Sequence, residues 1–559
     1  MERGAAALDA IAAVPGAPAG RPAGLPRAEV LALAALSGAL FLLRAAYSFS
    51  YPFDSDEPQH LHIAWAWTVD LLPYRDVFDN HAPLFHLLSA PLVALIGEDP
   101  RILVFMRLAM IPAFAATLWG SYALGRRLFG ARAGWWAAII CGLSPTFFFK
   151  SVEYRTDVLW AALWVLAIVV FLGGAPGRRR WFCGGLLLGA CLAVSLKTVM
   201  LLTALVIASA GVLLLAARPA RTFSCALAAA GGMVVLPAAV VAYFQARGAL
   251  PDLFYCAVQH NLLPGVGRWG DSKRLYLLLP VLALLILAAR FLIHRLPGIG
   301  VRAAFLLLLS GSQYLLLSTV YPVHWRQDLL PFYPLFTVLL AGALFAWRGR
   351  GAFVAAALVC LELALLPALA PLAGQGTRAQ ERLLSEVLRL TGPADYVLDL
   401  KGQSVFRNRP FYYALETMTL ERLARGLIED RIPERCVETR TCVAPADIAG
   451  FPPRARRFLE DQYVVVGAWR VAGRILAPVP EDALRPRSFE LAIPARYAVT
   501  GEAGPPRGML DGKPYDGPRD LAPGRHEYLP VPGDGRIAVF WEQAAGRGFS
   551  PFSPRGDRP

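Results

Sequence analysis

The sequence predicts an α-helical polytopic membrane protein, and three observations carry that prediction. Hydrophobic residues make up 56% of the 559 positions and charged residues only 17%, which is less charge than a soluble protein of this length carries. Several apolar runs reach roughly 16–23 residues, enough to cross a hydrocarbon core of about 30 Å. The net charge of +14 falls mostly in short loops between these runs, so it indicates membrane topology rather than nucleic-acid binding.

The apolar runs and the arginines between them predict about 11 transmembrane helices. We expect them at 28–48, 102–124, 133–149, 157–173, 181–196, 199–217, 223–244, 275–293, 303–320, 332–347 and 352–372. With the N-terminus inside, every arginine-rich loop lies in the cytoplasm, as the positive-inside rule requires. Residues 1–27 are rich in Ala, Pro and Gly and lack a signal-peptide core, so we predict a disordered cytoplasmic tail there. Residues 28–372 then form the transmembrane domain.

The outer segments are long and carry most of the acidic groups. Residues 49–101 form the first outer loop, in which 82–97, interrupted by Pro83 and Pro91, and "PQHLHIAWAW" are expected to be interfacial helices. An odd number of spans leaves 373–559 outside as a mixed α/β domain, with strands predicted at "ADYVLDL", "QYVVVGAWRV" and "GRIAVFWE". Cys436 and Cys442 in this domain are either a disulfide or two free thiols.

The unusual polar residues all fall on the predicted outer side. "DSDEPQHLH" opens the first loop, "YRDVFDNHAPLFH" follows it, and "KSVEYRTD", Lys197, "QHNLLPGVGRWGDSKR" and "YPVHWRQDLLPFYP" come later. A carboxylate can act as general base toward an acceptor hydroxyl, while Lys, Arg and His can stabilise a leaving phosphate. An apolar groove between helices can hold a lipid tail. These parts together predict glycosyl transfer from a lipid-linked sugar.

"DSDEPQHLHIAWAW" followed by "YRDVFDNHAPLFHLL" resembles the first outer loop of membrane glycosyltransferases with the GT-C fold. The resemblance is to the bacterial relatives of protein O-mannosyltransferases and of the lipid A aminoarabinose transferase, and it covers roughly residues 28–347. It implies an inverting transfer from a polyprenyl-phosphate sugar to a glycolipid, polysaccharide or protein of the cell envelope. High Ala and Arg usage favours a bacterial cytoplasmic (inner) membrane, and the order of the spans places the active site and the C-terminal domain on the periplasmic or exterior side.

The resemblance assigns roles to individual residues. Asp56 is the expected essential carboxylate, and Asp157 resembles the second outer acidic residue of the family. Glu57 is a third candidate catalytic residue, and it could instead cap the helix, bind a metal or orient Asp56. His81 stands where relatives often have a phosphate-binding lysine. The remaining expected donor contacts, by position, are Lys197, His260, Arg268, Arg326 and Tyr333.

Simpler readings stay open beside these roles. Asp56 could only cap the helix ahead of Pro58, and Asp157 could only pair with Arg155 or Lys150. His60 and His62 leave a divalent metal open, although their spacing defines no metal site. At the level of function, the alternatives are a transporter or flippase of lipid-linked glycans and a non-catalytic envelope assembly protein. The sequence shows neither the internal repeat nor the mid-span charges on both sides that a transporter often has.

Overall fold

The structure is a computed structural model, and it describes residues 25–174, 176–216, 223–267, 276, 278–296, 299–346, 350–476, 485–502, 504, 506–531 and 535–552. The chain divides into two compact units. We call Met1–Phe53, Asn80–Ser89 and Val104–Thr377 the helical unit, and Asp54–Asp79, Ala90–Leu103 and Arg378–Pro559 the mixed unit. The short first part of the mixed unit comes from the predicted first outer loop.

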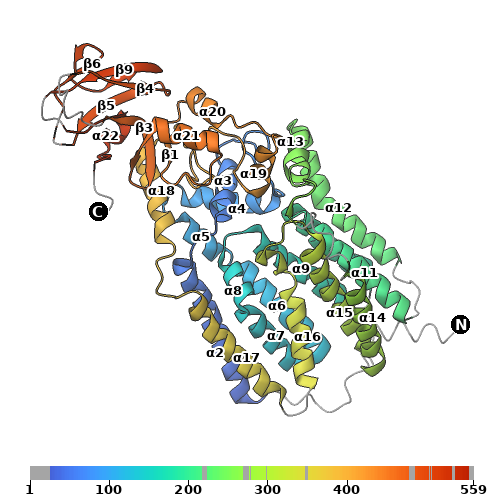
Figure 1. Ribbon diagram of the computed structural model, residues 1–559. Coiled ribbons are helices and arrows are strands. Elements are labelled where there is room, and N and C mark those ends of the chain that lie inside the picture. The colour runs from blue at the N-terminus through green and yellow to red at the C-terminus, as the bar shows by residue number, and fades with distance from the viewer. Residues whose placement is uncertain are drawn as a thin grey trace. The chain divides into compact units, whose positions relative to one another are not determined.

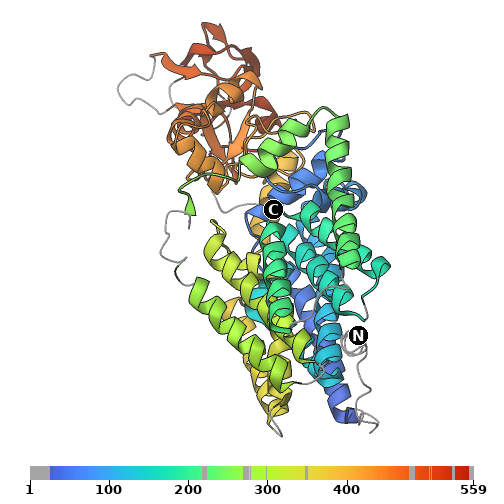
Figure 2. The same ribbon diagram turned by 90° about the vertical axis from the view of Figure 1, so that its right-hand side faces the viewer.

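Long helices running side by side build the helical unit (Figures 1 and 2). They are α2 (Arg27–Ser50), α6 (Ile111–Phe129), α7 (Ala131–Leu143), α8 (Pro145–Val152), α9 (Thr156–Leu172), α10 (Arg178–Val194), α11 (Thr198–Ala216), α12 (Phe223–Ala246), α14 (Leu278–Arg295), α15 (Gly300–Leu315), α16 (Tyr333–Ala346) and α17 (Gly351–Leu369). Shorter turns are α13 (Leu250–Phe254), η2 (Tyr255–Gln259), η5 (Leu316–Val320) and η6 (Arg326–Leu329). Helices α4 (Leu84–Ile96) and α5 (Ile102–Ala109) each have residues in both units.

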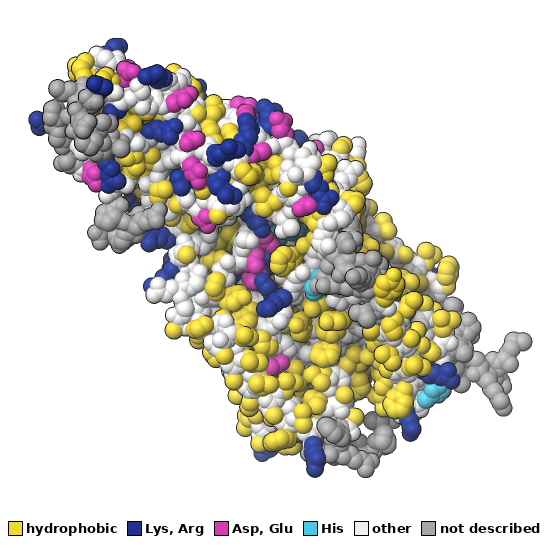
Figure 3. All heavy atoms as spheres, viewed as in Figure 1, with side chains coloured by type: hydrophobic (Ala, Val, Ile, Leu, Met, Phe, Trp, Pro, Cys, Tyr) yellow, Lys and Arg dark blue, Asp and Glu magenta, His cyan; other side chains and the backbone are white. Residues whose placement is uncertain are grey.

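The helical unit exposes the apolar surface that a lipid bilayer requires. Among the residues that the structure describes, seven segments are long and apolar enough to cross a membrane, and α8 with α9, bent by 119° at a short break, would make an eighth. Only 6% of the most apolar 18-residue stretch of α14 is buried, and only 11% of that of α12. Figure 3 shows a broad hydrophobic surface over the helices. In water such a surface would drive association. The chain is therefore a multi-pass membrane protein, while the count of about 11 spans stays a prediction. The expected spans overlap helices, but 102–124 is divided between α5 and α6, and 133–149 between α7 and α8.

Glycines bring helices α10 and α12 into direct backbone contact. A Cβ on Gly185 would lie 2.0 Å from the carbonyl oxygen of Ala229, and one on Gly232 would lie 2.2 Å from that of Phe182. Small residues spaced along a helix permit this close approach, on which packing between membrane helices depends.

The mixed unit combines short helices with two antiparallel sheets (Figure 1). Its helices are α3 (Asp56–Ala66), α18 (Arg378–Leu390), α19 (Thr417–Ala424), α20 (Ile432–Glu438), α21 (Pro453–Gln462) and α22 (Glu542–Gly546). One sheet has the order β1-β3-β10-β5-β8, with β2 also paired to β3, and the other has the order β4-β9-β6-β7. Their bounds are β1 Val443–Pro445, β2 Tyr463–Val466, β3 Trp469–Leu476, β4 Arg487–Leu491, β5 Ala495–Gly501, β6 Met509–Leu510, β7 Lys513–Pro514, β8 Arg519–Leu521, β9 Gly524–Leu529 and β10 Ile537–Trp541.

Two of the three predicted strand regions are strands, and one is not. "QYVVVGAWRV" forms the hairpin of β2 and β3, and "GRIAVFWE" contains β10, whose five residues are all buried. The strand prediction for "ADYVLDL" is wrong, because this segment makes only isolated bridges, Tyr396 with Asn408 and Val397 with Val443. Near the end of this segment the chain turns at Asp399, whose carboxylate accepts the backbone N–H groups of Gly402 and Ser404 and so favours a turn over an extended strand.

Candidate functional site

The stretch "DSDEPQHLH" leads into helix α3 of the mixed unit. The backbone N–H of Asp54 donates to Glu57 Oε1 at 2.9 Å, and the N–H of Asp56 donates to Asp54 Oδ1 at 3.1 Å. Ser55 is the N-cap and Asp56 is the first helical residue, so the reading of Asp56 as the cap of α3 is wrong. Glu57 is fully buried and binds this turn, whereas the Asp56 side chain keeps 26% of its surface exposed. Of the two carboxylates of α3, Asp56 is therefore the one that is partly open to solvent.

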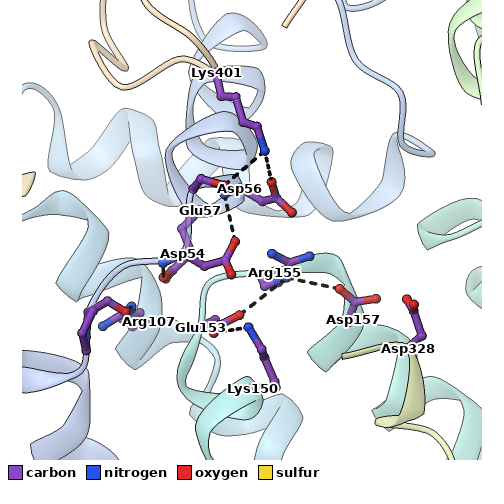
Figure 4. A network of polar contacts seen from close by, with 12 residues as sticks. Asp54, Asp56, Glu57, Arg107, Lys150, Glu153, Arg155, Asp157, Asp328 and Lys401 are labelled. Atoms are coloured by element: carbon purple, nitrogen blue, oxygen red, sulfur yellow. Dashed lines mark hydrogen bonds and ion pairs between the residues drawn. The ribbon is translucent and has the colours of Figure 1, made fainter. Parts of the chain in front are cut away.

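Lys401, which the sequence did not single out, binds this exposed carboxylate. Its Nζ donates to Asp56 Oδ1 at 2.9 Å and to Ser55 Oγ at 3.1 Å, and both residues belong to the mixed unit (Figure 4). Lys401 lies 345 positions further along the chain, in the part that carries little family resemblance. Lysine is rare here, since the sequence has only five, and that rarity is the one signal that could have drawn attention to it.

In the helical unit, a chain of alternating charges lies where α8 bends into α9 (Figure 4). Lys150 Nζ lies 2.7 Å from Glu153 Oε1, and Arg155 Nε lies 3.7 Å from Glu153 and 3.3 Å from Asp157. Asp157 sits in the first turn of α9, where the helix dipole favours an anion. The side chains of Glu153, Arg155 and Asp157 are each at most 5% exposed. Charges buried this deeply in a membrane protein usually line a functional cavity or pathway.

Lys197 extends this chain of charges from the turn between α10 and α11. Its ammonium donates to Asp157 Oδ1 and, at 2.7 Å, to Asp328 Oδ1. Asp328 in turn accepts the N–H of Trp325 at 2.7 Å at the start of η6. We call the six residues Lys150, Glu153, Arg155, Asp157, Lys197 and Asp328 the charged cluster. Its three cations and three anions balance, which offsets much of the cost of burying them.

Two other predicted phosphate contacts, His81 and His260, are not members of this cluster but lie on loops that contact each other. His81 is near enough to Asp157 to interact with it electrostatically. The adjacent Asn80 accepts a 2.8 Å hydrogen bond on its backbone oxygen from the side chain of Asn261, which follows the buried His260. The loops that hold His81 and His260 are therefore joined.

Two further predicted contacts lie outside the charged cluster, and one cannot be placed. Tyr333 begins α16 and packs against Phe147 of α8, with ring centroids 6.0 Å apart. Arg326 begins η6 and is exposed, two positions before Asp328. Arg268 lies outside the described residues.

Histidine and carboxylate side chains near α3 do not converge on a common point. His62 Nδ1 lies 2.7 Å from the carbonyl oxygen of Val405, and the imidazole is buried. Within the described ranges, no group of three or more His, Cys, Asp or Glu side chains is arranged to hold a metal ion. Cys436 and Cys442 are both buried free thiols.

Comparison with known proteins decides the type of fold. Residues 80–244 match the family model of dolichyl-phosphate-mannose-protein mannosyltransferase. The crystal structure of ArnT from Cupriavidus metallidurans in the apo state aligns with a TM-score of 0.52 at 12% identity, over 80% of this chain and 97% of that one. The chain has a GT-C type fold. ArnT bound to undecaprenyl phosphate aligns with a TM-score of 0.50 at 12% identity, over 80% and 98% of the two chains. No curated protein matches this sequence significantly.

The GT-C fold confirms the predicted architecture of membrane helices followed by a C-terminal domain that contains β-sheets. The family model covers the stretch in which five of the six charged-cluster residues lie, together with His81. Asp56 and Lys401 fall outside that match. The roles of the predicted site residues therefore depend on the geometry described above.

Proposed function

We propose that the protein is an inverting glycosyltransferase that moves a sugar from a polyprenyl-phosphate donor to an acceptor of the cell envelope. The acceptor would be a glycolipid, a polysaccharide or a protein, and transfer would occur on the outer face of the bacterial cytoplasmic membrane. One observation carries the proposal: the stretch that matches the mannosyltransferase family model holds five of the six residues of the charged cluster. The fold shared with ArnT, which has been crystallised with undecaprenyl phosphate, supports a lipid-linked donor.

The cations of the charged cluster suit a phosphate that gains charge as it leaves. Lys197 and Arg155 are held in place by Asp157, so they need no rearrangement when the phosphate arrives. Preorganised cations of this kind stabilise developing negative charge more effectively than mobile ones. In this proposal Asp157 orients the two cations, while His81 adds a third polar contact from the neighbouring loop.

Asp56 is assigned as the general base. Its carboxylate would accept the proton of the acceptor hydroxyl while the acceptor oxygen attacks the anomeric carbon. The bond from that carbon to the phosphate oxygen breaks on the opposite face, and polyprenyl phosphate leaves with the electron pair. Configuration at the anomeric carbon inverts in this single displacement, and the leaving phosphate, being an anion, requires no general acid.

The test compares envelope glycans in a host strain that lacks its own copy and expresses wild-type protein, Asp56→Asn or Asp520→Asn at matched levels. Asp520 is the control, because its side chain is 83% exposed on β8. We expect Asp56→Asn to remove one sugar from one glycan in mass spectra and Asp520→Asn to leave all glycans intact. Loss of that sugar in the deletion strain but not with Asp56→Asn would reject Asp56 as the base. Unchanged glycans in the deletion strain itself would reject the transferase function.

A further inference from the structure

We propose that Lys401 is a positioning residue for the carboxylate of Asp56, supplied by the C-terminal part of the chain. This inference rests on the proposed function and extends it to a residue outside the matched family region. The ammonium of Lys401 lies 2.9 Å from Asp56 Oδ1, and the two side chains are 18% and 26% exposed. The contact is therefore neither a solvated surface pair nor a fully buried one.

The loop that carries Lys401 is held rigidly by Asp399. The buried carboxylate of Asp399 accepts the N–H of Gly402 at 2.6 Å, and the N–H and hydroxyl of Ser404 at 2.9 and 2.6 Å. Arg409 donates to the same carboxylate at 2.9 Å. Four charge-assisted hydrogen bonds on one group leave the backbone on both sides of Lys401 little freedom.

The same loop is fastened to helix α3, which carries Asp56. His62, six residues after Asp56 on this helix, hydrogen-bonds the carbonyl oxygen of Val405 at 2.7 Å. Gly402 has a φ of +85°, and a Cβ there would lie 2.7 Å from Cβ of His62, so only glycine fits both the turn and the close contact. These two attachments fix the position of the Lys401 backbone relative to the start of α3.

The ammonium of Lys401, held in this way, restricts the conformation of the Asp56 carboxylate. A partly exposed carboxylate at a helix start samples several rotamers, and only one of them meets a given acceptor hydroxyl. The ammonium selects one rotamer and so holds the carboxylate oxygen in one place relative to the acceptor hydroxyl. Because an ion pair that is partly open to water contributes little to folding, its loss should affect the reaction far more than stability.

The test measures the rate of product formation in membranes of the host strain, which contain donor and acceptor, with full-length variants at matched levels. We expect Lys401→Met to slow the reaction at least 10-fold and Lys401→Arg, which keeps the cation, to stay within about 3-fold of wild type. Lys513→Met is the matched control, because it makes the same change on exposed strand β7, and it should leave the rate unchanged. Folding is checked by labelling of the buried Cys436, which should stay as slow in Lys401→Met as in wild type.

The outcomes separate this inference from the proposed function. A wild-type rate for Lys401→Met beside an inactive Asp56→Asn would overturn the role of Lys401 alone. Equal losses in Lys401→Met and Lys401→Arg, or rapid labelling of Cys436 in Lys401→Met, would show a structural contact and also overturn it. A wild-type rate for Asp56→Asn would remove the catalytic assignment on which the inference rests.

Discussion

The buried His62 should make the stability of the mixed unit depend on pH. Burial lowers the pKa of its imidazole from 6.5 to about 4; Asp399 and the carbonyl oxygen of Val405 oppose this, and Arg409 adds to it. In the unfolded chain the imidazole titrates near 6.5. Between pH 6.5 and 4 the unfolded state therefore takes up a proton that the folded state refuses. Stability is retained above pH 6.5 and falls as the pH is lowered through this window.

The size of the effect follows from the two pKa values. A difference of one pKa unit corresponds to about 1.4 kcal/mol, so lowering the pH from 7.5 to 5 should cost about 2 kcal/mol of unfolding free energy. Below pH 4 the loss levels off at about 3.4 kcal/mol, because both states are then protonated.

Cys436 and Cys442 provide the assay, because both thiols are buried in the mixed unit. At each urea concentration a brief labelling pulse, read by peptide mass spectrometry, gives the unfolded fraction at pH 7.5 and at pH 5. His62→Gln, which cannot titrate, should lose about 2 kcal/mol of the wild-type difference between the two pH values. His526→Gln is the control, because this histidine lies on strand β9 beside Asp511, away from helix α3 in the sequence. An equal pH difference in wild type and His62→Gln would refute the reasoning.

Two further predictions concern the helical unit. Lys197→Met should destabilise it by about 3 kcal/mol, which is the lower end of the range for breaking a buried ion pair, because Arg155 still faces Asp157. Thermal unfolding in detergent measures this loss. An unfolding midpoint equal to that of Lys513→Met would contradict the prediction. Gly232→Ala should destabilise by about 1–3 kcal/mol because its Cβ would meet a backbone oxygen of α10, whereas Gly231→Ala, with nothing within 4 Å, should be neutral. Equal midpoints for these two alanine variants would show that α10 and α12 do not pack as described.

The sequence by itself determined the elements whose signal is local. Apolar runs predicted the membrane helices, because hydropathy over about 20 residues is enough to decide whether a segment can cross a bilayer. A high content of β-branched and aromatic residues predicted β2, β3 and β10 in the same way. The acidic stretch that opens α3 was recognisable because the residues around Asp56 are contiguous.

Only the tertiary structure decided which charges meet. Lys197 joins Asp157 and Asp328 across 40 and 131 positions, and Lys401 reaches Asp56 across 345. The segment "ADYVLDL" has strand composition, yet Asp399 turns the chain there instead, and that turn is what presents Lys401. Propensity and hydropathy act over neighbouring residues, whereas an ion pair depends on the path of the whole chain between its two members. For this reason the helices could be read from the sequence, but the partner of the proposed catalytic carboxylate could not.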